Sequence, residues 1–463
     1  MNCCPIMIAE KMVRRNISSV PKAVLKPDQH VIENINKNIF TIRNHPGSMK
    51  PRSVLIPEPF IKAVVNATAD YPVKALLETS EKLNRHLKGR VPPMEKEELK
   101  ETVEKVQQKV LSRYANVTIN NDQDESRFRQ MIHNKTQNIL REKVYNWRPI
   151  KFDVYNSLVY LLGRSAPEYA VLAKIFGEIK SRDIDFIPRS LFDFGSGVGT
   201  ATWAAHRYWK QNIYEYFNVD ISRDINDLAQ TLLQGGTPKG NKPKGVFYRQ
   251  FLPATKVTYD IVISAYSMME LPSLQARLET VVNLWNKTGK YLVIVEQGTN
   301  AGFKIVNEIR DFILQVKHEQ NLGTVFSPCP HDDTCPRFLL DDGTPCNFEV
   351  TYFTLPLGGS SVAKKELYSY VILKKGKSNN TNPDQKWPRI IRPTLVRHKH
   401  CVCRMCTANG KLEEVIFTAS KHGKAMYQCA RSSKCGDLIP ATIEESKSQN
   451  VQSDENGQIL DDK

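Results

Sequence analysis

Short apolar segments recur through the middle of the chain, and stretches with helical character separate them. They cover residues 191–194, 216–219, 260–266 and 289–295. Short apolar runs that alternate with helical stretches are typical of buried strands in a parallel, doubly wound sheet. The pattern therefore predicts an α/β fold over residues 151–375.

Residues 92–145 are highly charged and have a helical pattern. Four-three-four spacing places one set of apolar residues on a single helix face, and a second set predicts another helix after a polar stretch. The first set is Leu99, Val103, Val106 and Val110, and the second is Phe128, Ile132 and Ile139. We expect a helical domain over residues 41–150 that packs on the α/β domain.

A polar linker at residues 376–383 leads into short, alternating and basic segments. Residues 415–417 and 425–427 predict small strands, so we expect a compact β-rich module over residues 386–440. The module is rich in cations near Trp387, namely Arg389, Arg392, Arg397, Lys399 and Arg404. Arginines that meet phosphates, beside aromatic rings that stack on bases, predict an RNA contact, and the alternative is a solvated basic edge.

The strand at residues 191–194 runs into a glycine-rich turn, and together they read LFDFGSGVG over residues 191–199. Gly195, Gly197 and Gly199 allow the backbone to approach a ligand closely, and a helix follows them. Asp220 ends the next strand, 21 residues after Gly199. This is close to the ~20-residue offset at which an acid reaches ribose hydroxyls in Rossmann-type folds.

Ligands of such sheets bind at the carboxyl ends of the strands, where Asp193 and Ser264 also lie. The G-x-G-x-G spacing differs from the dinucleotide fingerprint and resembles motif I of methyltransferases that use S-adenosylmethionine (SAM). The sequence therefore predicts a SAM site on Asp193, Gly195, Gly197, Gly199, Asp220 and Ser264.

The chain is basic, with 65 Lys and Arg against 49 Asp and Glu and a net charge of +16. Such an excess favours a polyanionic partner, most commonly a nucleic acid. No apolar run reaches the ~18 residues of a membrane span, so we expect no membrane partner. Residues 1–40 are interpreted as either a presequence or a disordered start, and residues 441–463 as an acidic tail.

Eight of the ten cysteines follow residue 328, and residues 5–328 contain none. Clustering of this kind in a basic chain favours metal binding over disulfides. Ligation by thiolates alone suits an iron–sulfur cluster, whereas Cys403, Cys406, Cys429 and Cys435 could instead form a four-thiolate zinc site. Spacing does not separate these alternatives, and His331 is interpreted as a loop residue.

Several motifs in this order resemble one family, the mitochondrial small-ribosomal-subunit assembly family of methyltransferase-like proteins. The resemblance covers residues 150–440 and depends on SAPEY at 165–169, FIP at 186–188, the glycine turn, SAYS at 264–267, VEQGT at 295–299, CPHDDTCP at 329–336 and SYVIL at 369–373. It implies a Rossmann-like SAM-binding domain, a 4Fe-4S cluster and a role on the maturing small subunit in the mitochondrial matrix. Its partners would be small-subunit rRNA and ribosomal proteins.

The same resemblance implies that Cys329, Cys335 and Cys346 are the first three cluster ligands. The fourth falls in the run at residues 401–406, where we expect Cys403, with Cys406 as the alternative.

The strand at residues 260–266 is not followed by the Asn/Asp-Pro-Pro-Tyr clamp that amino-group methyltransferases often use. It reads SAYS over residues 264–267. No catalytic residues are therefore assigned, and we expect an assembly factor that retains the SAM pocket without methyl transfer. The alternative is an active SAM-dependent rRNA methyltransferase, because proximity alone accelerates methyl transfer.

Overall fold

The computed structural model describes residues 24–115, 121–144, 147–315, 322–376 and 383–444. Residues 1–23, with Cys3 and Cys4, and most of the expected acidic tail lie outside this part of the chain. No helix among the described residues is both long and apolar enough to cross a membrane.

A nine-stranded sheet forms the centre of the protein. Five parallel strands run in the order β5 (Val246–Arg249), β4 (Glu215–Val219), β3 (Ser190–Phe194), β6 (Tyr259–Ala265) and β7 (Thr288–Gln297). The long strand β10 (Ala363–Lys375) pairs antiparallel with β7, and its other side pairs with β8 (Gly323–Ser327) and β9 (Phe348–Phe353). The short β2 (Ser53–Val54) completes the edge. This confirms the predicted parallel-rich α/β sheet.

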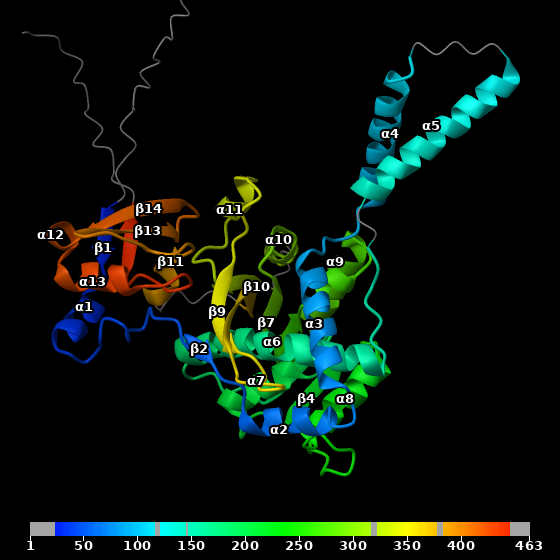
Figure 1. Cartoon of the computed structure of the whole chain (residues 1–463). Coiled ribbons are helices and arrows are strands. Elements are labelled where there is room, and N and C mark those ends of the chain that lie inside the picture. Colours follow the sequence, from blue (N-terminus) through cyan, green and yellow to red (C-terminus); the bar gives the residue numbers. More distant parts are fainter. Residues whose placement is uncertain (1–23, 116–120, 145–146, 316–321, 377–382, 445–463) are drawn as a thin grey trace, which may run out of the picture.

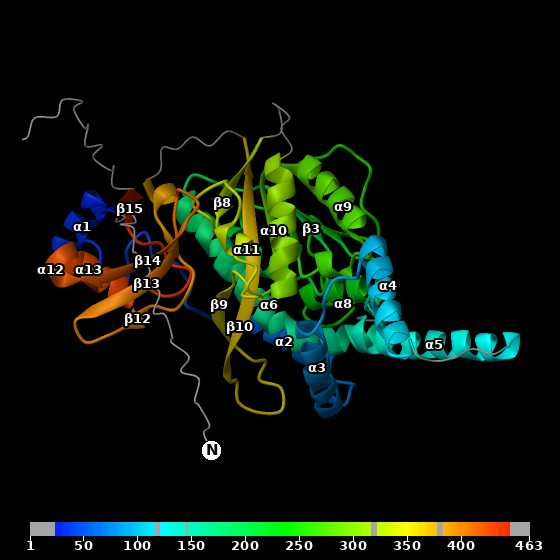
Figure 2. The same ribbon diagram turned by 90° about the horizontal axis from the view of Figure 1, so that it is seen from above.

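Helices cover both faces of the sheet (Figures 1 and 2). One face packs on α2 (Glu58–Ala67), α3 (Val73–Lys88), α6 (Val154–Arg182), α7 (Thr200–Trp209) and α8 (Arg223–Leu233). The other packs on α9 (Leu274–Lys287) and α10 (Asn300–Gln315). The two faces have separate apolar cores because successive strand residues point to opposite sides.

A helical arm projects from the body, made of α4 (Lys96–Ser112) and α5 (Asp122–Lys143) (Figure 1). Val106 and Val110 of α4 pack on Ile132 and Leu140 of α5 in a small core of their own. Leu99, which the pattern placed on the same stripe, is exposed.

The C-terminal module contains a four-stranded sheet of β11 (Arg389–Ile390), β12 (Leu395–Val396), β13 (His400–Cys406) and β14 (Leu412–Thr418). Two helices, α12 (Ala419–His422) and α13 (Lys424–Ser432), pack beside it. The strand expected at residues 425–427 is therefore helical, because Met426, Cys429 and Ala430 bury one helix face.

The N-terminal segment joins this module and not the helical region (Figures 1 and 2). Strand β1 (Val24–Pro27) pairs antiparallel with β15 (Ala441–Glu444), and Val31 of α1 (Gln29–Asn36) packs in one core with Trp387 and Leu438. Residues 24–40, which the sequence assigned to a presequence or disordered start, are thus part of the folded protein. The pairing joins the two ends of the described chain, and such a long-range contact leaves no local sequence signal.

Candidate functional site

The glycine-rich turn forms one wall of a cavity of about 340 Å³ at the carboxyl ends of β3, β4 and β6. Gly195 and Gly197 have φ values of +70° and +50°, in the left-handed region that favours glycine. A Cβ on Gly195 would lie 2.1 Å from the Ser267 Oγ atom, so a side chain there would force the turn to move. The turn therefore needs glycine for both its backbone conformation and its packing.

Three of the six residues predicted to bind SAM line this cavity, namely Gly195, Gly197 and Asp220. The Asp220 carboxylate accepts hydrogen bonds from the Gly197 and Ser222 backbone N–H groups, at 3.1 and 3.0 Å. This ties the end of β4 to the glycine turn. The cavity volume of about 340 Å³ lies in the range of several hundred Å³ that is typical of small-molecule sites.

The other three predicted residues lie behind the cavity wall. Gly199 caps α7, and Asp193 and Ser264 are buried in the adjacent strands. Burial raises the pKa of Asp193 to about 8, and the charge of Asp220 adds to the shift. A carboxyl with this pKa is mostly protonated at neutral pH. Asp193 is not among the residues that line the cavity.

Helix α6 supplies a polar wall that the sequence analysis missed. Tyr160, Arg164 and Glu168 follow one another at four-residue spacing and all line the cavity. The Tyr160 hydroxyl donates to Glu168 at 2.5 Å, and Arg164 donates to Glu168 and Glu366 at 3.2 and 2.8 Å. Four-residue spacing of polar residues in an apolar helix was the available signal.

Two donors on this wall have no hydrogen-bond partner among the described residues: Arg164 Nη2 and Tyr266 Oη. The Arg164 guanidinium lies 5.0 Å from the centre of the Tyr266 ring. Tyr266 has a φ of +59°, an uncommon and strained conformation for a residue other than glycine. Because buried donors are nearly always paired, these two groups point to a polar ligand in the cavity.

The opposite end of the cavity carries Glu296 and the ion pair between Arg90 and Glu270. Burial raises the pKa of Glu296 to about 7, although it accepts hydrogen bonds from the Met269 and Met268 N–H groups. The Ser267 hydroxyl lies within hydrogen-bond distance of the Phe194, Gly195 and Ala265 carbonyls. It therefore serves the turn.

A second site lies between the sheet and the C-terminal module. Four thiols line a small cavity there, those of Cys329, Cys335, Cys346 and Cys406. Burial raises the pKa of Cys406, and the neighbouring Cys329 and Cys335 thiols raise it further. All four are free cysteines. Four converging thiols from two loops and a strand match the donor set of an iron–sulfur cluster.

The structure brings Cys406 to this cavity in place of the expected Cys403. Cys401 and Cys403 point from β13 into the core of the module, where they pack with Met405 and Phe417. Cys406 ends the strand and points to the opposite face. Side chains of a strand alternate in direction, so an odd separation of three residues places Cys403 and Cys406 on different sides.

The alternative zinc set also does not converge. Cys403 packs in the module core, Cys429 lies in a different apolar cluster, and the Cys435 thiol donates to the Asn347 carbonyl at 3.8 Å. No group of three His, Cys, Asp or Glu side chains in the described ranges is arranged around a single ion. A cluster is larger than an ion and accepts thiols that are farther apart.

Arg310 and His331 complete the thiol site, and the sequence analysis missed both roles. Arg310 donates to the His331 and Asp333 carbonyls at 3.1 and 2.6 Å, which orders the loop between Cys329 and Cys335. The buried His331 ring lies 3.3 Å from the Cys406 sulfur. Burial lowers the pKa of His331 to about 4, so the ring is neutral.

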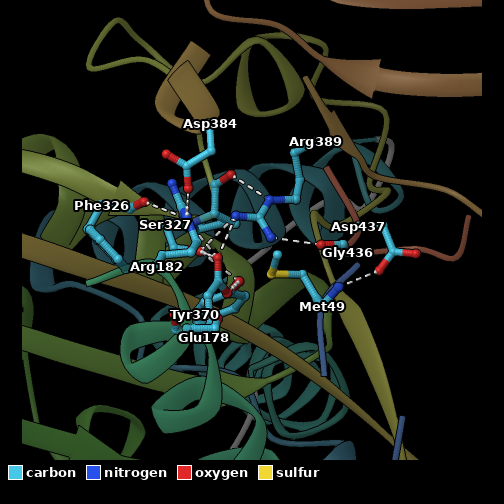
Figure 3. Close-up of polar contacts among 12 residues, drawn as sticks. Met49, Glu178, Arg182, Phe326, Ser327, Tyr370, Asp384, Arg389, Gly436 and Asp437 are labelled. Atoms are coloured by element: carbon cyan, nitrogen blue, oxygen red, sulfur yellow. Dashed lines mark hydrogen bonds and ion pairs between the residues drawn. The ribbon is translucent and has the colours of Figure 1, made fainter. Parts of the chain in front are cut away.

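A buried ion network joins the module to the α/β domain next to the thiols (Figure 3). Arg389 donates to Glu178 at 2.6 Å, to the Pro328 carbonyl at 3.1 Å and to the Gly436 carbonyl at 2.7 Å. Glu178 also accepts from Arg182, which in turn donates to Asp384. Burial alone would raise the pKa of Glu178, but Arg389 and Arg182 together lower it to about 2.

This network removes some of the residues that the sequence predicts to contact RNA. Arg389 and Trp387 are 1% and 3% exposed, so neither is accessible to RNA. Arg392 donates to the Pro345 carbonyl at 3.1 Å, which again ties the module to the cysteine loops. Arg397 and Lys399 are exposed on the module. Some cations of this basic cluster are thus structural and others are exposed, and composition alone does not show which are which.

The fold and the first site define a class. A glycine turn after the first central strand, an acid after the second and an antiparallel strand beside the fifth are features of a Rossmann-like, doubly wound α/β fold. Residues 154–440 match the family described as mitochondrial small ribosomal subunit Rsm22, and the chain belongs to this family.

The chain is 36% identical to the human mitochondrial ribosome assembly protein METTL17 over 411 residues, which cover 86% of this chain and 85% of that protein. It is 24% identical to the mitochondrial ribosome assembly protein RSM22 of Saccharomyces cerevisiae, over 41% of this chain and 45% of that one. Among solved structures, the magnesium protoporphyrin IX methyltransferase of Synechocystis with bound SAM matches 50% of this chain and 88% of its own, with 14% identity and a TM-score of 0.30.

Proposed function

We propose that this protein is an assembly factor of the mitochondrial small ribosomal subunit that acts in the matrix and binds rRNA, SAM and a 4Fe-4S cluster. The observation that carries the proposal is the match of residues 154–440 to the Rsm22 family, which spans both sites. The human and yeast relatives are both named as mitochondrial ribosome assembly proteins. A net charge of +16 supports RNA as a partner.

SAM would bind in the cavity beside the glycine turn. Gly195 and Gly197 allow its close approach to the backbone, and Asp220 lies where an acid meets ribose hydroxyls. Arg164 Nη2 would donate to the carboxylate of SAM, which would supply the partner that this buried group lacks. When bound, SAM carries an activated methyl group.

The cluster would be held by Cys329, Cys335, Cys346 and Cys406. Three of these thiols belong to loops of the α/β domain, and the fourth belongs to the module. A cluster on this set would therefore link the two parts, in addition to the Arg389–Glu178 ion pair. Because cluster binding is coupled to folding, a bound cluster would further stabilise the loops that the Arg310 hydrogen bonds already order.

We infer that the protein does not transfer the methyl group, because its Ser267 hydroxyl serves the glycine turn and no acceptor clamp is formed. The second candidate is an rRNA methyltransferase. Glu296 favours it, since a carboxylate with a pKa of about 7 that lines the cavity is suited to act as a base.

Gly197→Leu tests the SAM site. A Cβ on Gly197 would have room, because its nearest neighbour, the Tyr160 Cε1 atom, lies 3.6 Å away. The rest of the leucine side chain would then fill the cavity. We expect calorimetric SAM binding to be lost. Gly235→Leu is the matched control, because Gly235 also has a positive φ of +85° but lies in open space outside the cavity. Equal SAM affinity in Gly197→Leu and wild type would contradict the site.

The same variant separates the two functions. Mitochondria that contain only the wild type or only Gly197→Leu are compared for small-subunit assembly and for methylation of small-subunit rRNA. An assembly factor leaves the methylation pattern unchanged in both. A methylated nucleotide that depends on the protein and disappears in Gly197→Leu would establish the methyltransferase instead.

A further inference from the structure

A second large cleft, of about 1070 Å³, lies between the N-terminal segment and the α/β domain. Its walls are residues 28–53, the end of α6 with the turn that follows it, the end of α7, Asp384 just before the module and Trp387 at the start of the module. It shares no lining residue with the SAM cavity or the thiol site. A Cβ on Gly177 would lie within 3 Å of the Tyr208 hydroxyl and the Lys50 carbonyl, so the three walls meet at the cleft floor.

Cations predominate in this cleft. Five basic side chains line it, namely Lys50, Arg52, Lys180, Arg182 and Arg207, together with His30 and the buried His45, against the carboxylates of Asp28 and Asp384. Two of the cations are already neutralised. Arg52 pairs with Asp437 at 2.8 Å, and Arg182 pairs with both Glu178 and Asp384 at 2.9 Å (Figure 3).

Three cations remain, and we call the site that they define the basic cleft. No carboxylate among the described residues forms an ion pair with Lys50, Lys180 or Arg207. Lys50 donates only to the Asn44 amide oxygen, at 2.6 Å. Three unpaired cations on the walls of one concavity come from segments that are far apart in the sequence. Their convergence favours an extended anion over bulk solvent.

Aromatic rings accompany the cations. Phe40 and Tyr208 are half-buried and line the same cleft, and the Arg207 guanidinium lies 5.9 Å from the centre of the Tyr208 ring. A positively charged groove with aromatic side chains is the usual arrangement for single-stranded nucleic acid. Stacking on Phe40 and Tyr208 needs bases with free faces, which a single strand offers and a paired double helix does not.

We propose that the basic cleft binds a single-stranded segment of RNA, with phosphates on Lys50, Lys180 and Arg207 and bases against Tyr208 and Phe40. The proposal rests on the proposed role in ribosome assembly and identifies where the RNA is held. It places this contact outside the module residues that the sequence analysis favoured.

The test compares two triple variants that lose the same charge. K50Q/K180Q/R207Q empties the basic cleft of unpaired cations, and K239Q/K242Q/K244Q removes three exposed lysines from the loop after α8. Binding of single-stranded oligonucleotides that tile small-subunit rRNA is measured by anisotropy at several salt concentrations. Three lost phosphate contacts should weaken binding about 50-fold at 0.15 M salt and reduce the salt slope by about 2.

The control triple variant should bind like the wild type, and both variants should have the wild-type melting temperature. Equal binding by both triple variants, with unchanged salt slopes, would overturn the basic cleft while leaving RNA binding intact. If the wild type bound none of the oligonucleotides, the proposed RNA-binding function would fail, and the cleft with it. Tighter binding of the same sequences as duplexes would also overturn the single-strand assignment.

A photo-crosslinking amino acid at Ser181, an exposed position in the cleft, gives an independent readout on assembling subunits. We expect it to crosslink to rRNA. Crosslinking to a ribosomal protein with no RNA adduct would show that a protein occupies the cleft and would overturn the proposal.

Discussion

The two faces of β13 give its cysteines different surroundings, although they lie within six residues of one another. Cys401 and Cys403 are fully buried in the module core, whereas Cys406 meets three thiols from the α/β domain. A thiol in an apolar core behaves as a small hydrophobe, and only a thiol beside other thiols is positioned to bind a metal.

Replacement of the thiols one at a time distinguishes the two faces. We expect Cys406→Ser to remove the iron and acid-labile sulfide of anaerobically purified protein, because it deletes one of four converging ligands. Cys403→Ser should keep both, and should only lose about 1–3 kcal/mol of stability from a hydroxyl in an apolar core. Iron and sulfide are measured in parallel with the visible spectrum. Loss of the cluster in Cys403→Ser alone would reverse the assignment.

At the scale of secondary-structure elements, one helix, α6, contributes side chains both to the cavity beside the glycine turn and to the junction with the module. Its 29 residues carry Tyr160, Arg164 and Glu168 at the cavity beside the glycine turn, and Glu178 and Arg182 at the junction with the module. Residues four apart share a helix face, so one rigid element holds the polar groups of both sites in fixed relative positions. The arm formed by α4 and α5 is the opposite case, since its core is separate from that of the body.

Deletion of residues 96–143, with a short glycine–serine linker in their place, should leave the body folded. The flanking residues already lie close together, because Glu95 accepts from the Leu274 N–H and the Trp147 indole donates to the Met269 carbonyl. We expect SAM affinity and the melting temperature of the body to be unchanged. Loss of SAM binding on deletion would show instead that the arm supports the cavity.

At the scale of the whole molecule, charged groups at the junction connect the cysteine site and the basic cleft. Arg389 touches the loop that begins the cysteine site, and Glu178 links it through Arg182 to Asp384 at the cleft. A buried ion pair is costly to break, because removal of one partner leaves the other charge buried and unpaired.

Glu178→Gln should therefore destabilise the protein by about 3–5 kcal/mol at pH 7, measured by denaturant unfolding. The folded pKa of Glu178 is about 2, against 4.5 when unfolded, so its ionised form stabilises the protein above pH 4.5. This contribution, about 3 kcal/mol, is lost as the pH falls toward 2, and the difference from Glu178→Gln should shrink accordingly.

Glu101→Gln is the matched control for that experiment, since it removes an exposed pair with Lys105 on the arm. Such a surface pair contributes at most about 0.5 kcal/mol. Equal stability of the two variants at pH 7 would show that the network at Glu178 does not hold the junction.

The sequence by itself determined the α/β sheet and the glycine turn with Asp220 at its edge. Both follow from neighbours in the chain: apolar runs set the strands, and the order of strand, turn and helix sets which residues reach the carboxyl ends. The family resemblance, which depends on the order of motifs in the sequence, assigned Cys329, Cys335 and Cys346 to one group.

Only the tertiary structure decided which thiol completes that group. It also buries Arg389 and Trp387, which makes them inaccessible to RNA, and it places residues 24–40 with the C-terminal module. Each depends on a contact between segments hundreds of residues apart, or on which face of a strand points toward them. Composition and spacing contain neither, because they do not specify which distant surfaces fold against each other.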